Sequence, residues 1–330
     1  MRVVLDAMGS DTHPLPEVHA SVEAARLFGD EILLVGNEEQ LKPLLKEANP
    51  DDAAVRIIHA PEVFLMTDKI SGSALRRSKN SMGVGMDLMK AGKADVFVTA
   101  GNTGGAMAIG LARFGRIRGV KRPTLVVQIP VKGGYCMITD VGANAICKPE
   151  FLVQFAKMGA VYSRIGLGIE NPRVGLISIG EEAGKGNDLV KATFPLLEAS
   201  GLNFYGNVEG KEIFGGEVDV AVTDGFTGNV MVKASEAVAK LLIERLREEL
   251  MASIRTKAGA LLAKPAFTAL RKTLDPSEVG AIPLLGLNGL VFIGHGRSDA
   301  KSLVSGIRAA RQGVEENLLE NLRKSISEVL

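Results

Sequence analysis

Short apolar runs rich in β-branched residues alternate along this chain with longer segments whose apolar residues recur every three or four positions. The short runs predict strands, because buried strands are brief and mostly apolar. They cover residues 2–5, 31–35, 55–58, 95–98, 124–129, 135–139, 173–179, 203–205, 218–222, 281–285 and 290–293. Helical periodicity fills intervening segments such as 82–90 and 150–164. We therefore predict an α/β fold with three α/β/α layers and a mainly parallel sheet.

The clearest helical segment covers about residues 227–250. Its apolar residues lie at helical spacing on one face: Val230, Ala234, Ala237, Val238, Leu241, Leu242, Leu246 and Leu250. An apolar helix face is usually buried, so we expect this one to lie in the core or against another subunit. No internal repeat, linker or clear boundary divides the sequence, and we predict one α/β domain over residues 1–330.

The composition suits a large α/β core, since the 330 residues are 46% hydrophobic and include 38 glycines but no tryptophan. The formal net charge of +1 gives no overall field that would attract nucleic acid. Cys136 and Cys147 have no metal-ligand spacing, and we expect reduced structural thiols. Because there are four histidines and no HExxH motif, we expect no metal site.

The N-terminal sequence MRVVLDAMGSD does not predict a signal peptide, because its apolar run stops at Asp6. No segment reaches the roughly 18 uninterrupted apolar residues of a membrane span. We expect a cytoplasmic protein whose membrane contact is at most peripheral, at the inner face of the cell membrane.

Glycine-rich turns with polar residues follow the predicted strands: DAMGSD, AGNTGG, DVGAN, GEEAGKGN, DGFTGN and GHGRSD. Ligands of parallel sheets bind at the carboxyl ends of strands, so we expect these turns to share one edge and one site. The candidate substrate-binding residues in or just after the turns are Asp6, Gly9, Asn102, Thr103, Asp140, Asn144, Glu181, Gly186, Asn187, Asp224, Gly225, Thr227, Gly228 and Lys233.

The stretch LISIGEEAGKGND, residues 176–188, differs from a nucleotide-binding P-loop. Gly180 and Gly184 are one residue too close, and Lys185 is followed by glycine instead of serine or threonine. Two readings remain open: a solvated turn with one lysine, or a glycine-rich turn that binds a small anion through backbone N–H groups. No GxSxG elbow or candidate nucleophilic cysteine supports a covalent acyl-enzyme. The donor-rich turns suit an anionic substrate and a developing oxyanion.

Taken together, these motifs resemble the PlsX family of phosphate acyltransferases. DAMGSD resembles the family's opening DAMGGD. The other matching segments, in order, are AGNTGGAMA, RPTLVVQIP, DVGAN, NPRVGLISIGEEAGKGN, NFYGNVEG, DVAVTDGFTGNVMVK and PLLGLNGLVFIGHGRSDA. The likeness runs from Arg2 to about Ala310. It departs at Ser10, Thr99 and Gly105, where the family commonly has glycine, serine and alanine.

The resemblance implies the fold of isocitrate and isopropylmalate dehydrogenases and of phosphotransacetylase, in a homodimer. It implies that a fatty acyl group is transferred from acyl carrier protein to inorganic phosphate, without a cofactor. The acyl phosphate formed would supply the first acylation of glycerol 3-phosphate in phospholipid synthesis. On this reading, GEEAGKGND is a loop for inorganic phosphate and the transferring acyl group.

Three residues receive catalytic roles as hypotheses. Lys185 and the nearby glycine N–H groups would hold phosphate. Asn229, with the backbone N–H groups of the sequence TGN, would stabilise the thioester oxyanion. His295 would protonate the leaving thiolate, or would be only a hydrogen-bonded turn residue. We expect Asp6, Asp140 and Asp224 to orient donors, because a bare carboxylate beside phosphate would repel it.

Residues 250–274 contain no acidic residue and are predicted to form an inserted basic amphipathic hairpin, with Pro265 separating two helices. Its candidate partner-binding residues are Arg255, Lys257, Leu261, Leu262, Lys264, Phe267, Arg271 and Lys272. The hairpin is interpreted either as a subunit interface or as a docking surface for acidic acyl carrier protein or anionic lipid.

Other functions remain open at this stage. One is a phosphotransacetylase-like enzyme that uses acyl-CoA. Another is a nicotinamide-dependent decarboxylating dehydrogenase of the same fold, although GHGRSDA matches a dinucleotide fingerprint only in part. A third is a lipid-surface scaffold that uses the basic hairpin alone.

Overall fold

Eleven strands form one sheet, and each overlaps a predicted apolar run. The computed structural model describes residues 1–68 and 79–327, apart from the side chains of Arg271, Lys272 and Pro276. The strands are β1 (Arg2–Asp6), β2 (Glu31–Gly36), β3 (Val55–His59), β4 (Val96–Thr99), β5 (Thr124–Val131), β6 (Gly134–Thr139), β7 (Val174–Ile177), β8 (Phe204–Val208), β9 (Val220–Val222), β10 (Ala281–Leu285) and β11 (Val291–Gly294). Their order across the sheet is β3-β2-β1-β4-β11-β10-β5-β6-β9-β7-β8.

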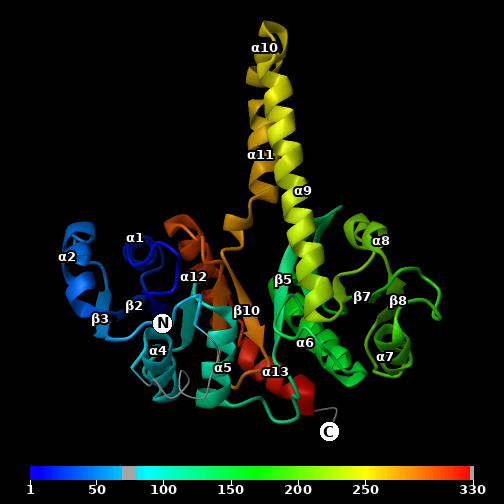
Figure 1. The fold of residues 1–330 in the computed structure, drawn as a ribbon, viewed down its shortest axis with the longest axis horizontal. Helices are drawn as coiled ribbons and strands as arrows, with labels where there is room; N and C mark the ends of the chain where they lie inside the picture. The colour runs from blue at the N-terminus through cyan, green and yellow to red at the C-terminus, as the bar shows by residue number, and fades with distance from the viewer. Residues whose placement is uncertain (69–78, 328–330) are drawn as a thin grey trace.

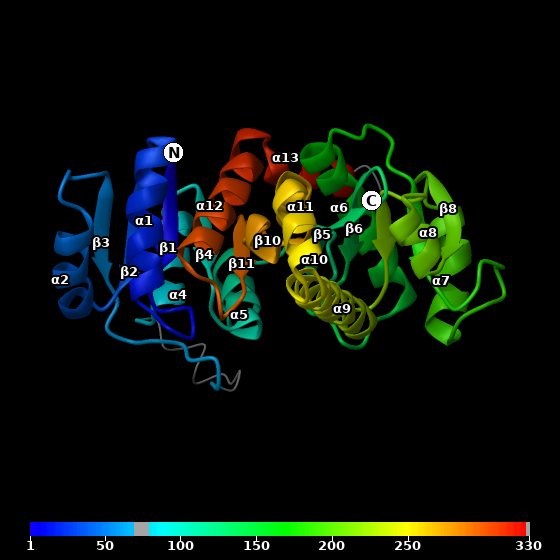
Figure 2. The ribbon, with the colours of Figure 1, turned by 90° about the horizontal axis from the view of Figure 1, so that it is seen from above.

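Helices cover both faces of the sheet, as Figure 1 and Figure 2 show. They are α1 (Leu15–Phe28), α2 (Glu38–Ala48), α4 (Ser81–Lys90), α5 (Thr103–Phe114), α6 (Pro149–Leu167), α7 (Asp188–Glu198), α8 (Gly210–Gly215), α9 (Gly225–Met251), α10 (Ile254–Leu262), α11 (Lys264–Leu274), α12 (Ala300–Glu315) and α13 (Leu318–Ser327). Successive strand residues point to opposite faces, so Val3 and Leu5 join one buried cluster and Val4 joins the other. The predicted three-layer α/β/α fold is confirmed.

Strand direction reverses across the middle of the sheet. Strands β3, β2, β1, β4 and β11 run parallel to one another, as do β6, β9, β7 and β8. Between these halves, the pairs β11–β10, β10–β5 and β5–β6 are antiparallel. The two parallel halves therefore point in opposite directions. The prediction that all six polar turns follow strands on one sheet edge is wrong: they form two groups of three.

Helix α9 extends beyond the sheet, and α10 and α11 fold back along it as a projecting hairpin (Figure 1). Val238, Leu241 and Leu242 on its apolar stripe are each more than half exposed. This face is therefore not core of the single chain, which leaves subunit contact as the other expectation. Leu262 and Lys264 flank the junction between α10 and α11, and Pro265 lies in the first turn of α11. None of the described helices is long and apolar enough to cross a membrane.

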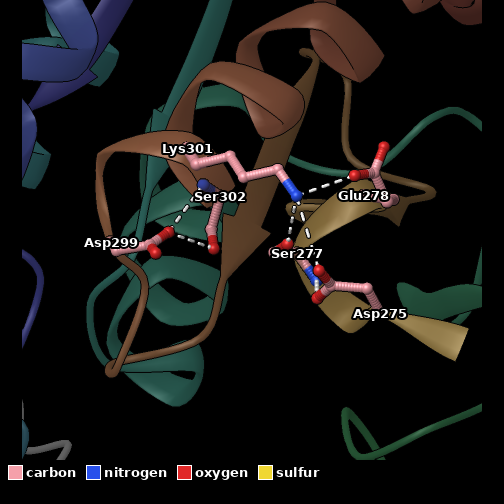
Figure 3. Close-up of polar contacts among 6 residues, drawn as sticks. All are labelled: Asp275, Ser277, Glu278, Asp299, Lys301 and Ser302. Carbon is pink, nitrogen blue, oxygen red and sulfur yellow. Dashed lines mark hydrogen bonds and ion pairs between the residues drawn. The ribbon is translucent and has the colours of Figure 1, made fainter. Parts of the chain in front are cut away.

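The base of the hairpin is fastened to α12 by Lys301 (Figure 3). Its Nζ lies 2.7 Å from Glu278 Oε1, 3.2 Å from Ser277 Oγ and 3.4 Å from Asp275 Oδ2. These contacts hold the segment that leaves α11 against the first turn of α12. Asp299 caps the same helix, since its Oδ1 accepts the N–H of Ser302 at 2.8 Å.

Candidate active site

Asp140 organises the turn that follows β6. Its side chain is fully buried and accepts the N–H groups of Leu125 (2.9 Å), Ala143 (3.2 Å) and Asn144 (2.6 Å). The Asn144 amide also donates to Asp140 Oδ2 at 3.0 Å and to the Pro123 carbonyl at 2.7 Å. Burial raises the pKa of the Asp140 carboxyl, and the accepted hydrogen bonds lower it in part. Both side chains are used to shape the turn and do not point at a ligand.

The start of α9 packs against this turn without space for side chains. A Cβ on Gly225 would lie 2.6 Å from Asp140 Oδ2, and one on Gly228 would lie 2.0 Å from the Asp140 carbonyl oxygen. Only glycine allows the helix to approach the backbone so closely. The close approach places Asn229, which is exposed, over the β6 turn: a Cβ on Gly142 would be 4.0 Å from Asn229 Oδ1.

The first N–H groups of α9 already have acceptors. The N–H of Gly225 donates to the Asn144 carbonyl at 2.8 Å, and those of Phe226 and Thr227 donate to Asp224 Oδ1 at 3.0 and 2.9 Å. The N–H of Gly228 donates to the Asp224 carbonyl at 3.0 Å. Thr227 Oγ1 also donates to Asp224 Oδ2, at 2.8 Å. The expectation that backbone N–H groups of TGN bind an oxyanion is therefore wrong; the Asn229 side chain remains available.

The turn between β7 and α7 differs from the start of α9, because several of its N–H groups have no acceptor. Asn187 caps α7 by accepting the N–H of Val190 at 3.0 Å. In the described part of the chain, the N–H groups of Gly184, Gly186, Asp188 and Leu189 donate to no acceptor. Lys185 is exposed, and no described carboxylate lies within 4.0 Å of its ammonium group. Free amides at a helix start beside an unpaired cation make a site for an anion.

Gly186 permits this geometry. Its φ is +104°, and a Cβ there would lie 2.6 Å from Val190 and 3.1 Å from Ser178 Oγ. Any other residue would be strained and would clash with the first turn of α7. The glycine after Lys185, which argues against a P-loop in the sequence, is thus required by the packing of this turn.

Glu181 is held away from Lys185 by a second lysine. Lys211 Nζ lies 2.6 Å from Glu181 Oε1, 3.3 Å from Glu212 Oε1 and 3.7 Å from Glu209 Oε2. These carboxylates are the group of described acids close enough to hold a cation, and the Lys211 ammonium group occupies their centre. The acids raise the pKa of Lys211, chiefly through its hydrogen bond with Glu181. Sequence reasoning missed this role of Lys211, which no local spacing reveals.

The turns of the first half are bound mainly to one another. Buried Asp6 accepts Thr99 Oγ1 at 2.7 Å and the N–H of Met8 at 3.1 Å. A Cβ on Gly9 would lie 2.8 Å from Thr99 Oγ1 and from the Gly101 nitrogen, so the turns after β1 and β4 pack backbone to backbone. Burial raises the pKa of Asp6. Like Asp140, Asp6 accepts hydrogen bonds that hold the shape of its turn.

Glu17 is a second buried acid beneath the same turn. It accepts the N–H of Ser10 at 3.0 Å through Oε1, while its Oε2 is buried without a hydrogen bond among the described residues. Burial raises its pKa, and the charge of Asp6 adds to the effect. Sequence reasoning missed Glu17, because a glutamate in the first turn of a helix is ordinary.

Asn102 and Thr103 start α5. Asn102 Oδ1 accepts the N–H of Gly105 at 2.9 Å, and its Nδ2 donates to the Met66 carbonyl at 2.9 Å. The N–H groups of Thr103 and Gly104 have no acceptor among the described residues. The turn itself contains no lysine or arginine. It can therefore offer an anion its free backbone N–H groups, but no positive charge of its own.

His295 joins the two groups of turns. Its Nδ1 accepts the N–H of Arg297 at 3.3 Å, which leaves the proton of a neutral ring on Nε2. The pKa of His295 is lowered, first by desolvation and then by the positive charges of Lys233 and Arg297. Lys233 belongs to α9, where its Nζ pairs with Glu236 at 2.9 Å. The charge of Lys233 on α9 therefore links the second half to the β11 turn, although the two sheet halves point in opposite directions.

Comparison with known proteins supplies the family. The family model described as "Fatty acid synthesis protein" matches residues 1–321. A phosphate acyltransferase of Pelotomaculum thermopropionicum is 44% identical over 330 residues, which are 100% of this chain and 96% of the relative. That of Aquifex aeolicus is 43% identical, with 99% of this chain and 98% of the relative covered. The chain belongs to the phosphate acyltransferase family. It is accordingly an acyltransferase, as the resemblance in the sequence predicted.

Solved structures agree on the fold of this acyltransferase. The EutD phosphotransacetylase of Staphylococcus aureus matches with a TM-score of 0.60 and 15% identity, covering 94% of each chain. A branched-chain phosphotransacylase of Enterococcus faecalis matches with a TM-score of 0.60 and 14% identity, covering 95% of this chain and 99% of that one. At such low identity the likeness concerns the fold alone.

Proposed function

We propose that this acyltransferase moves a fatty acyl group from acyl carrier protein to inorganic phosphate, giving an acyl phosphate for phospholipid synthesis. The observation that carries the proposal is the contrast between the starts of α7 and α9. The β7–α7 turn has four free amides, two of them at the start of α7, and the unpaired Lys185, whereas the α9 start is filled by Asp224 and Asn144. A phosphate ion fits the first arrangement and is repelled by the second.

Phosphate is assigned to the β7–α7 turn. The amides of Gly184 and Gly186 and the two free amides at the start of α7 would donate to its oxygens, with Lys185 balancing charge. The α5 start also has free amides, but its own turn sequence contains no lysine or arginine. Because Lys211 neutralises Glu181, this acid of the loop does not oppose the anion.

The reaction needs phosphate to be positioned more than activated. A phosphate oxygen attacks the thioester carbonyl carbon, a C–O bond forms, and collapse of the tetrahedral oxyanion breaks the C–S bond. Hydrogen phosphate loses one proton and the leaving thiolate gains one, so the products are an acyl phosphate and a free thiol. Holding both reactants in this geometry supplies much of the acceleration.

Asn229 is assigned to the oxyanion. Strands β9 and β7 are neighbours, with Val222 beside Leu176, so the α9 and α7 turns leave the sheet side by side. The Asn229 amide is exposed on the first turn of α9 and can donate to a carbonyl oxygen there. Removal of one such donor typically lowers kcat by about 10²–10³-fold.

His295 is assigned a hydrogen bond to the leaving group and not the transfer of a proton. With its lowered pKa and its Nδ1 used by the Arg297 N–H, the neutral ring can offer only the Nε2 hydrogen. It would donate a hydrogen bond to the leaving sulfur, while the transferred proton originates from phosphate. Asp6, Asp140, Asp224 and Asn144 would hold turns, and Lys233 would tune His295.

The projecting hairpin is assigned to partners. Arg255, Lys257 and Lys264 are exposed together with Leu261 and Leu262. A basic surface with apolar side chains suits acidic acyl carrier protein or the anionic inner face of the cell membrane. The exposed stripe of α9 suits contact with a second copy in a homodimer. We further propose that residues 1–330 form one catalytic domain with this hairpin as an insertion; the side chains of Arg271 and Lys272 lie outside the described structure.

The test is phosphate-dependent formation of acyl phosphate from palmitoyl-acyl carrier protein, trapped as hydroxamate. Lys185→Ala and Asn229→Ala should each lower kcat/KM by about 100-fold or more. Lys191→Ala, an exposed lysine on α7 beyond its first turn, is the matched control and should retain activity. Near-normal activity in both site variants would refute the residue assignment. Product formed from palmitoyl-CoA but not from the carrier protein would assign the phosphotransacetylase-like reaction instead.

A further inference from the structure

Each turn of the second half carries one large apolar side chain that faces solvent. Ile146 is 91% exposed, more than any other large apolar residue that the structure describes. Ile179 is 78% exposed and Phe226 is 66% exposed. Turn residues at a polar site are ordinarily hydrophilic, so three such side chains need a physical explanation. An exposed apolar group rimmed by polar residues typically marks a binding surface.

The three side chains belong to neighbouring strand ends. Thr139 of β6 and Leu176 of β7 both lie beside Val222 of β9, so the turns that follow start next to one another. Phe226 follows Gly225, whose N–H donates to the Asn144 carbonyl at 2.8 Å, and Ile146 lies two residues beyond Asn144. Phe226 and Ile146 therefore flank one direct backbone contact.

Ile179 lies on the other side, at the phosphate turn. It follows Ser178, whose Oγ would be 3.1 Å from a Cβ on Gly186. The apolar rim, defined as Ile146, Ile179 and Phe226, thus borders both the free amides near Lys185 and the Asn229 amide. Val230 lies one helical turn after Phe226 on α9 and is more than half exposed. It extends the apolar rim toward the hairpin.

We propose that the apolar rim binds the first methylenes of the fatty acyl chain during transfer. The inference rests on the proposed function, since an acyl group whose carbonyl carbon reaches phosphate must begin its hydrocarbon within one bond of the polar donors. Water-exposed apolar side chains at that point would be covered by the chain. Each methylene removed from water should strengthen binding by about fourfold.

The test compares two donors on the same carrier protein, palmitoyl and acetyl, because an acetyl group has no methylene. Ile146→Ser, Ile179→Ser and Phe226→Ser should each lower kcat/KM for the palmitoyl donor by about fourfold to fifteenfold, from the loss of one to two methylene contacts. The acetyl donor should change by less than about twofold. The exposed Leu27 at the end of α1 supplies the control Leu27→Ser, which should affect neither donor.

Binding of the fluorescent fatty acid cis-parinaric acid gives a readout that does not require turnover. Weaker binding in the rim variants, with unchanged thermal unfolding and sedimentation, would support the proposal. Equal losses with both donors, or unchanged parinaric acid binding, would overturn it. Rim variants that turn a dimer into a monomer would also overturn it, by assigning the rim to a contact between copies. If the wild-type chain forms acyl phosphate from neither donor, the proposed function fails, while the binding measurement still tests the rim.

Discussion

Each half of the sheet uses a buried aspartate to hold a turn, but the turns around the two aspartates expose different groups. In each half a buried aspartate ends or follows a strand, Asp6 at β1 and Asp140 after β6, and holds the backbone of its turn. In the first half the turns after β1 and β4 pack backbone to backbone, and a second buried acid, Glu17, lies beneath. In the second half the turns beyond the aspartate expose Lys185, Asn229, free amides and the apolar rim.

This difference teaches how to interpret an aspartate in a glycine-rich turn. The position suggests a ligand or a base, yet both carboxylates accept hydrogen bonds from their own turn and from a neighbouring strand. In the proposed function the chemistry is assigned to Lys185 and Asn229, whose side chains have no partner within the described chain. A buried carboxylate of this kind is a support for the site and is a poor candidate for contact with phosphate.

The largest expected effect is on the free energy of unfolding and concerns Asp140, which holds the turn after β6 in the second half. Asp140→Ala should lower the free energy of unfolding by about 3–5 kcal/mol, because three backbone N–H groups lose their buried acceptor and cannot turn elsewhere. Asp6→Ala should cost less, since one of its donors is the Thr99 hydroxyl, which can rotate. Urea denaturation followed by circular dichroism measures both. An Asp6 variant as damaged as the Asp140 variant would contradict this contrast.

A smaller effect is expected from the unpaired acid of the first half. Glu17 has a raised pKa in the folded chain, so above the ordinary glutamate range the native state holds a charge that the unfolded chain hydrates better. Glu17→Gln should therefore raise the free energy of unfolding at pH 8 by about 1 kcal/mol. The gain should fade as the pH falls to where both states of wild-type Glu17 are protonated.

The matched control for that variant is Glu23→Gln, on the exposed side of α1. It should leave the pH dependence of unfolding unchanged. A Glu17→Gln variant that is less stable than wild type at pH 8 would mean that the carboxylate is needed in its charged form.

The smallest expected effect tests the connection between the halves. Lys233→Met removes a positive charge that lowers the pKa of His295, so this pKa should rise toward its ordinary value. NMR titration of the imidazole, assigned with His295→Gln, measures the change. Lys240→Met, two turns further along α9, should leave it unchanged. No shift in the Lys233 variant would mean that α9 does not approach the β11 turn as described.

The sequence alone determined the elements and the family. All eleven strands and the long helix at 225–251 follow from local apolar patterns, which depend on neighbouring residues only. The ordered motifs were sufficient to identify a phosphate acyltransferase. Lys185 and Asn229 were also selected from the sequence, and their roles remain predictions.

Only the tertiary structure decided which groups are free to act. Strand direction depends on the antiparallel pair of β10 with β5, which joins Leu284 to Leu125 far along the chain, so the six turns could not be assigned to edges beforehand. Whether an N–H group or a lysine has a partner depends on which other segment packs against it. Asp224 and Asn144 accept the first N–H groups of α9, and Lys211 forms an ion pair with Glu181 of the β7–α7 turn. The Asp224 cap is local, but the pairings of Asn144 and Lys211 join segments that meet only in the folded chain, so no local pattern encodes them.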